Sequence, residues 1–329
     1  MIDIHTHVVP LELPFGATGD GPWPTVSRAG DDATVFMGSE RFREINRSAW
    51  DRQARLEEMD RHGVEFQVLS PMPELFCYWA DPPAGAAYCR GVNTWLAEQS
   101  GERFGAFGIV PLQDPELAAE SLADVRRLGL LGVEIGSNVN GVALHDPAFE
   151  PFLAEAERLE IPVLIHPFHP FGFETLRGGP AASGVTFPNE IGFAAGGLIA
   201  EGVLERHPGM RICCTHGAGS LGLLLPRLDR MWELDPSFRE RVPRTPSSYA
   251  AQLYVDLLVF NPRALSYVMD TVGHERMVVG SDYPFMSDQP GELLGRLPGL
   301  SPLQQQRIRR LNALDLLGRT ESTERNLHV

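Results

Sequence analysis

Short apolar runs rich in β-branched residues alternate along the chain with longer segments in which apolar residues recur every three to four positions. The short runs predict buried strands, and the longer segments predict amphipathic helices. The alternation occurs eight times, which is typical of a parallel sheet whose strands are connected by helices. The predicted strands are Ile2–Val9, Phe66–Ser70, Phe104–Val110, Gly132–Ile135, Pro162–His166, Arg211–Thr215, Leu253–Leu258 and Met277–Gly280.

The predicted helices begin at capping residues or prolines, and several end at a glycine. They are Asp51–His62, Gly85–Glu98, Pro115–Leu128, Pro147–Leu159, Asn189–His207, Gly219–Leu234, Pro262–Val272 and Ser301–Leu317. Eight strand–helix units predict an α/β fold, a (β/α)8 TIM barrel that forms a single domain over residues 1–318. A polar C-terminal tail is expected over residues 319–329.

Two segments are longer than a minimal barrel requires. Residues 11–48 follow the first strand and are rich in Gly and Pro, and residues 167–188 follow the fifth strand. We expect both to be long loops, rim insertions at the C-terminal face of the barrel, where barrel enzymes carry their active sites. Substrate specificity should therefore reside in them. The second loop also contains His169 and Arg177, whose roles the sequence leaves open.

The chain of 329 residues has 28 Lys and Arg against 43 Asp and Glu, a formal net charge of −15. Nucleic acids and anionic membranes need a basic surface, so this charge balance argues against both and favours a small-molecule substrate. The four Cys do not make a disulfide framework. We identify neither a signal peptide nor an apolar stretch long enough to span a bilayer, and we expect a cytoplasmic protein.

Histidines and an aspartate stand at the ends of several predicted strands. His5 and His7 are two residues apart in the first strand, so their side chains point to one face. His166 ends the fifth strand, and Asp282 follows the eighth. Three imidazoles and a carboxylate at one barrel face suit a divalent metal that keeps an open position for water. We predict one Zn²⁺ there, with Mn²⁺, Fe²⁺ or Co²⁺ as alternatives.

His216 follows the sixth strand and lies outside this ligand set. An imidazole titrates near neutral pH, so His216 can accept a proton and return it. A metal ion can activate water or polarise a substrate oxygen, and both reactions need such a base. Decarboxylation and hydrolysis of a lactone or amide are therefore both open. A catalytically silent barrel is a third hypothesis, against which the complete set of candidate ligands argues.

The residues just described lie in segments that resemble the amidohydrolase superfamily, specifically its metal-dependent decarboxylase branch. The similarity covers almost the whole chain and is most specific in Phe42–Ala80, His166–Pro167, Thr215–Arg230 and Gly280–Phe285. The branch lacks the carboxylated lysine of binuclear amidohydrolases, and the predicted fourth strand, GVEIGS, ends without one. The resemblance implies a metal bound by His5, His7, His166 and Asp282, with His216 as acid/base and Asp282 also taking part in catalysis.

The resemblance also implies how the substrate is bound. Arg43 and Arg227 are expected to bind substrate carboxylates, and Phe168 and Phe285, within or beside the matching segments, are expected to contact the substrate. A homodimer is implied in which Arg227 reaches the site of the neighbouring subunit.

The implied activity is a non-oxidative decarboxylation that releases CO₂ from a carboxymuconate semialdehyde-type substrate or a related aromatic carboxylate. A metal-dependent hydrolase of a lactone or amide in aromatic catabolism is the alternative. The chain departs from the branch after His166, where HPFHPFGFETLRGGP stands in place of HPWD, so the identity of the carboxylate stays open.

Overall fold

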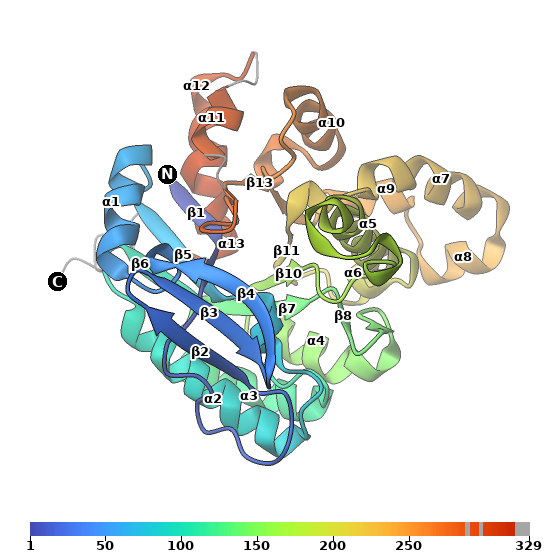
Figure 1. The fold of residues 1–329 in the computed structure, drawn as a ribbon. Coiled ribbons are helices and arrows are strands. Elements are labelled where there is room, and N and C mark those ends of the chain that lie inside the picture. Colours follow the sequence, from blue (N-terminus) through green and yellow to red (C-terminus); the bar gives the residue numbers. More distant parts are fainter. Residues whose placement is uncertain (287–289, 296–298, 320–329) are drawn as a thin grey trace.

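The structure is a computed structural model that describes residues 1–286, 290–295 and 299–319. Eight strands form one sheet in the order β1-β5-β6-β7-β10-β11-β12-β13, and every neighbouring pair is parallel. Parallel bridges from Asp3 to Val279 and from Thr6 to Tyr283 join the last strand to the first. The predicted (β/α)8 barrel is therefore confirmed, with its helices packed around it (Figure 1).

The barrel strands lie close to their predicted positions and are on the whole shorter. They are β1 (Ile2–Val8), β5 (Phe66–Pro71), β6 (Phe104–Gly108), β7 (Gly132–Gly136), β10 (Val163–His166), β11 (Ile212–Cys214), β12 (Tyr254–Asp256) and β13 (Met277–Val278). A two-stranded ribbon of β8 (Asn138–Val139) and β9 (Val142–Ala143) follows β7.

Capping residues explain several helix boundaries. Asp51 accepts a hydrogen bond from the N–H of Ala54 at the start of α1, and Gly63 ends that helix with a φ of 65°. The helices are α1 (Arg52–His62), α2 (Pro82–Gln99), α3 (Pro115–Arg127), α4 (Glu150–Arg158), α5 (Gly179–Ala200), α6 (Val203–Arg206), α7 (Leu221–Leu234), α8 (Pro236–Arg241), α9 (Pro246–Ala250), α10 (Pro262–Val272), α11 (Pro290–Gly295), α12 (Pro302–Gln306) and α13 (Asn312–Leu316). A π-helical turn, Arg307–Leu311, joins α12 to α13, so the last predicted helix is interrupted.

The segment between β1 and α1 contains a sheet, and the expectation of a long loop was wrong. Its three antiparallel strands are β2 (Pro24–Ala29), β3 (Asp32–Met37) and β4 (Glu40–Asn46). Two-residue turns connect them, and each turn begins with a glycine of positive φ, Gly30 at 69° and Gly38 at 60°. Glycine supplies this conformation in hairpin turns without a steric cost, so these glycines mark hairpins.

The loop after β10 is also shorter than expected, because α5 begins at Gly179 and the prediction placed its start at Asn189. Pro188 lies inside this helix. Proline removes a helical hydrogen bond and usually marks a helix boundary, which explains the error. The additional helical turns carry Phe187. The predicted helix also ends earlier, since α6 is a separate helix.

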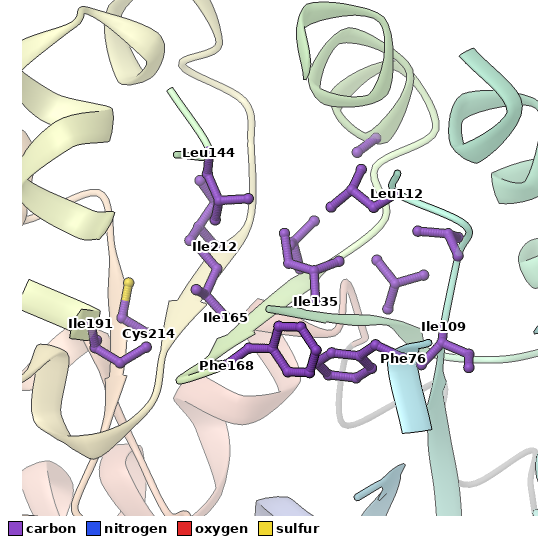
Figure 2. Close-up of a cluster of buried hydrophobic side chains, with 14 of the residues drawn as sticks. Phe76, Ile109, Leu112, Ile135, Leu144, Ile165, Phe168, Ile191, Ile212 and Cys214 are labelled. Carbon is purple, nitrogen blue, oxygen red and sulfur yellow. The ribbon is translucent and has the colours of Figure 1, made fainter. Parts of the chain in front are cut away.

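Two apolar clusters hold the barrel together. One fills the barrel interior, because each barrel strand, or the residue just before it, contributes a side chain, and α13 packs against it. Its members are Ile2, Ile4, Val68, Phe107, Leu131, Leu164, Cys213, Tyr254, Val278, Ala313, Leu314, Leu316 and Leu317. The other packs the strands against the surrounding helices, and Figure 2 shows a part of it around Ile135 and Ile165.

The predicted tail lies outside the described residues, apart from Arg319. None of the helices in the described ranges is long and apolar enough to cross a membrane.

Candidate metal centre

A bulge in β1 brings both of its histidines into the barrel interior. Between the pairs Asp3↔Gln67 and Thr6↔Leu69, β1 advances by three residues while β5 advances by two. Such an extra residue locally breaks the alternation of side chains. Ile4 therefore packs in the interior cluster, and the imidazoles of His5 and His7 face the same interior beside it.

The structure brings the four predicted ligands together. His5, His7, His166 and Asp282 each place a possible ligand atom within 4.8 Å of the others, and all four residues are buried. The Nε2 atom of His7 lies 3.2 Å from Nε2 of His5 and 3.0 Å from Oδ1 of Asp282. Ligand atoms about 2.1 Å from a tetrahedral metal are about 3.4 Å apart, so this spacing fits a metal site. Nε2 of His166 is buried without a hydrogen-bond partner, as expected for an atom that binds a metal.

The second nitrogen of each ring has a partner of its own. Nδ1 of His5 lies 2.7 Å from Oδ2 of Asp256, and Nδ1 of His166 lies 2.9 Å from the carbonyl oxygen of Pro167. Nδ1 of His7 lies 3.3 Å from the carbonyl oxygen of Pro71. Partners of this kind hold a ligating imidazole in one orientation and one tautomer. They leave Nε2 of each ring for the metal.

The charges of the cluster shift its pKa values. Burial alone would lower the pKa of His5, but the hydrogen bond to Asp256 and the neighbouring carboxylates outweigh it and raise this pKa. Burial lowers the pKa of His7 and, more strongly, that of His166. Burial would raise the pKa of Asp282, but the hydrogen bond to His7 and the nearby imidazoles lower it. The carboxylate of Asp282 is therefore ionised, as a metal ligand must be.

His216 lies beside the cluster and outside the ligand set. Its ring centroid is 5.4 Å from that of His166 and 5.7 Å from that of His5. Nε2 of His216 is buried without a hydrogen-bond partner, and burial lowers the pKa of this imidazole to about 4. A neutral ring with a free nitrogen next to a metal site can accept a proton from water or substrate.

Arg43 and Phe285 reach the same centre from two different elements. The guanidinium of Arg43, on β4, lies 4.6 Å from the ring centroid of Phe285. The ring of Phe285, which follows β13, is in turn 5.6 Å from the ring of His7. The small sheet of β2, β3 and β4 thus places a cation next to Phe285, in the segment that the sequence predicted to be a long loop.

Phe168 and Arg227 are not brought to the ligands. The ring of Phe168 packs against Phe76 and Tyr78, at centroid distances of 5.4 and 5.3 Å, and Figure 2 shows it in the apolar cluster beside Phe76. Arg227 is exposed on α7 and makes no ion pair with another described residue. In Figure 1, α7 lies at the edge of the molecule.

Three residues near the centre were not predicted. Asp256 ends β12 and forms a hydrogen bond with His5. The one feature of the sequence that could have indicated its role is a charged residue within an apolar strand. Glu134 on β7 is fully buried, 3.8 Å from Nδ1 of His7, and burial together with the charges of Asp282 and Glu74 raises its pKa well above the usual value. The half-buried ring of Phe187 lies 6.1 Å from that of His216.

The sequence and the fold of this chain are similar to those of known proteins. An amidohydrolase family model matches residues 2–319. The chain belongs to the amidohydrolase family. Within this family it is 32% identical to a 2-amino-3-carboxymuconate-6-semialdehyde decarboxylase of Dictyostelium discoideum, over 96% of this chain and 91% of the relative.

Solved structures of decarboxylases are also similar to this amidohydrolase. A 5-carboxyvanillate decarboxylase from Sphingomonas paucimobilis superposes with a TM-score of 0.76 at 25% identity, covering 83% of this chain and 85% of the other. A dihydroxybenzoic acid decarboxylase from a Polaromonas species, solved with bound manganese, has the same fold, with a TM-score of 0.74 at 24% identity over 84% of this chain and 89% of the other.

Proposed function

We propose that this protein is a metal-dependent, non-oxidative decarboxylase that releases CO₂ from a carboxymuconate semialdehyde-type or related aromatic carboxylate. The buried cluster of three histidines and Asp282, with the neutral imidazole of His216 beside it, carries this proposal. The names of the similar proteins support the same class of reaction.

We propose that His5, His7, His166 and Asp282 hold a single divalent ion. A bound ion of this kind lowers the pKa of a coordinated water and polarises substrate oxygens. Nitrogen-rich sites suit zinc, which we propose first. Manganese is the alternative, because the Polaromonas decarboxylase contains it.

In the proposed reaction His216 moves the proton. Its Nε2 takes up one proton from the solvent in each turnover and delivers it to the substrate carbon that bears the carboxylate. The carbon–carbon bond then breaks, its electron pair returns to the unsaturated system, and CO₂ leaves, so that one proton replaces one carboxyl group. Arg43 holds a substrate carboxylate through a charge-assisted hydrogen bond, and the rings of Phe187 and Phe285 exclude water from the reacting carbon. Phe168 packs against Phe76 and Tyr78 in the apolar cluster next to the site and helps to hold that part of the barrel in place.

We further propose a homodimer in which Arg227 completes the site of the neighbouring subunit. Along α7, Leu223, Arg227, Met231 and Leu234 follow the spacing of one helix face. Leu223 is 74% exposed and Leu234 is 58% exposed. An apolar stripe of this kind on the surface is typical of a protein interface. We also propose that the chain is a single barrel domain and acts in the cytoplasm on a small carboxylate, with neither nucleic acid nor membrane as a partner.

Hydrolysis of a lactone or amide is the second candidate function, since the metal site and His216 could equally activate water. Turnover in ¹⁸O-labelled water separates the two. Decarboxylation evolves CO₂ in step with substrate loss and leaves no label in the carboxyl groups of the remaining organic product. Stoichiometric ¹⁸O in a product acid, without CO₂, would contradict the proposal. A spectrophotometric screen over muconate semialdehydes and hydroxybenzoates, with the metal-loaded enzyme, then identifies the carboxylate.

A further inference from the structure

The two carboxylate oxygens of Asp256 serve two different parts of the site. Oδ2 lies 2.7 Å from Nδ1 of His5. Oδ1 accepts hydrogen bonds from the N–H groups of Gly217 and Leu258, at 2.9 and 3.0 Å. Asp256 is completely buried, so no solvent competes for these bonds. One side chain thus connects the ligand-bearing strand β1 to the turn that contains His216.

The turn held by Asp256 has an unusual backbone. His216, Gly217, Ala218 and Gly219 all have positive φ, at 53°, 62°, 57° and 56°. L-amino acids such as His and Ala rarely adopt this region, and they remain in it only where the surroundings hold them. The hydrogen bond from the N–H of Gly217 to Asp256 is such a restraint, since Gly217 directly follows His216.

Packing holds the same turn from its other sides. A Cβ atom on Gly217 would lie 2.4 Å from Cγ1 of Val259, and one on Gly219 would lie 1.8 Å from the carbonyl oxygen of Pro188. That carbonyl accepts the N–H of Ser220 at 3.0 Å. The turn is therefore closely packed, and Asp256 is the charged group that ties it to β12.

We propose that Asp256 is a positioning residue with two separable actions: Oδ2 orients His5 for the metal, and Oδ1 fixes the turn that aims His216 at the substrate. The proposal rests on the function proposed above. It predicts that metal affinity and proton transfer depend on the same carboxylate through different oxygens.

Asp256→Asn and Asp256→Ala separate the two actions. The amide oxygen of Asn can still accept the backbone N–H groups, but its NH₂ group cannot accept a hydrogen bond from His5. We expect Asp256→Asn to weaken metal binding about 10–100-fold while kcat at saturating metal stays within a few-fold of native. Asp256→Ala should weaken metal binding similarly and also lose kcat at saturating metal.

Three measurements decide the proposal. Chelator competition gives the metal dissociation constant, and amide hydrogen exchange at Gly217 in the metal-free protein reports on the turn, with protection kept in Asp256→Asn and lost in Asp256→Ala. In a His216→Asn background, Asp256→Ala should cause no further loss of kcat, because both changes act through one group. Asp114→Asn, at the N-terminal cap of α3, is the matched control and should change none of these values.

Native metal affinity in Asp256→Asn would overturn the first action. Retained Gly217 protection, or native kcat at saturating metal, in Asp256→Ala would overturn the second. If Asp256→Ala does not fold, the proposal still stands or falls on the metal affinity and the Gly217 exchange of Asp256→Asn. Both measurements need no substrate, so they remain decisive even if the enzyme proves not to be a decarboxylase.

Discussion

Nε2 of His7 lies 3.0 Å from Oδ1 of Asp282 across the seam where the barrel closes. His7 belongs to β1, and Asp282 follows β13, and only isolated bridges pair these two ends of the sheet. Backbone hydrogen bonds from the N–H of His7 to Tyr283 and from the N–H of Asp282 to His5 support the seam. A metal bound between the two side chains would cross-link the first and the last strand.

Metal removal should therefore lower the melting temperature. A ligand that binds only the folded state stabilises it by about 2.7 kcal/mol at a free concentration of 100 times its Kd. Calorimetry with excess chelator, and then with added zinc or manganese, measures the shift. His166→Gln lacks one ligand and should show a much smaller shift. Equal melting temperatures with and without chelator would argue against a metal between these strands.

Metal affinity should fall as the pH falls, with His5 as the first ligand to protonate. The pKa of His5 is raised above the usual imidazole value of about 6.5, so protons begin to compete with the metal above that pH. The pKa values of His7 and His166 are lowered, so these rings compete only in more acidic solution. Chelator competition from about pH 5 to pH 8.5 covers the usual range of imidazole titration. Constant affinity down to pH 6 would contradict the shift.

Arg43→Met should lower kcat/KM about 10–100-fold, because a charge-assisted hydrogen bond to a carboxylate contributes about 1.5–3 kcal/mol. Metal affinity should not change, since Arg43 reaches the centre through Phe285 and is not a ligand. Arg41→Met is the matched control on the same strand, because Arg41 is exposed and pairs with Glu44. Steady-state kinetics that show equal losses for both variants would count against a role for Arg43 in binding.

Mixing two inactive variants tests the role of Arg227 across the dimer. In a heterodimer of His216→Asn with Arg227→Met, one site has both an intact His216 and an intact Arg227 from the neighbouring chain. Random exchange of subunits should restore about a quarter of the native activity if the dimer is a symmetric pair. Sedimentation or light scattering confirms the oligomeric state. No recovery despite proven subunit exchange would place Arg227 in its own subunit's site, or in none.

The sequence predicted the parts of the site that depend on local spacing. His5 and His7 share a face because they are two residues apart, and His166 and Asp282 lie at strand ends, which a parallel barrel brings to one rim. The eight strands were predictable for the same reason, since each is a short buried run in a regular alternation.

Residues that act through distant partners could not be predicted in this way. Asp256 is separated from His5 by 251 positions, and no local pattern links an aspartate in an apolar strand to a histidine so far away. Phe187 was hidden by Pro188, which indicated a loop where the helix in fact continues. The hairpins that carry Arg43 did have a signal, the two-residue turns that begin at Gly30 and Gly38, but the Gly- and Pro-rich composition of the whole segment indicated a loop.

The bulge in β1 makes one strand supply both the apolar floor of the barrel, through Ile2 and Ile4, and the pair of imidazoles above it. A shift of one residue turns every side chain of a strand to the opposite face. The extra residue lies between Asp3 and Thr6, so inserting one residue between Ile4 and His5 would turn both imidazoles away from the interior without changing any ligand. The length of the segment from Asp3 to Thr6 is as essential to the metal centre as the histidines themselves.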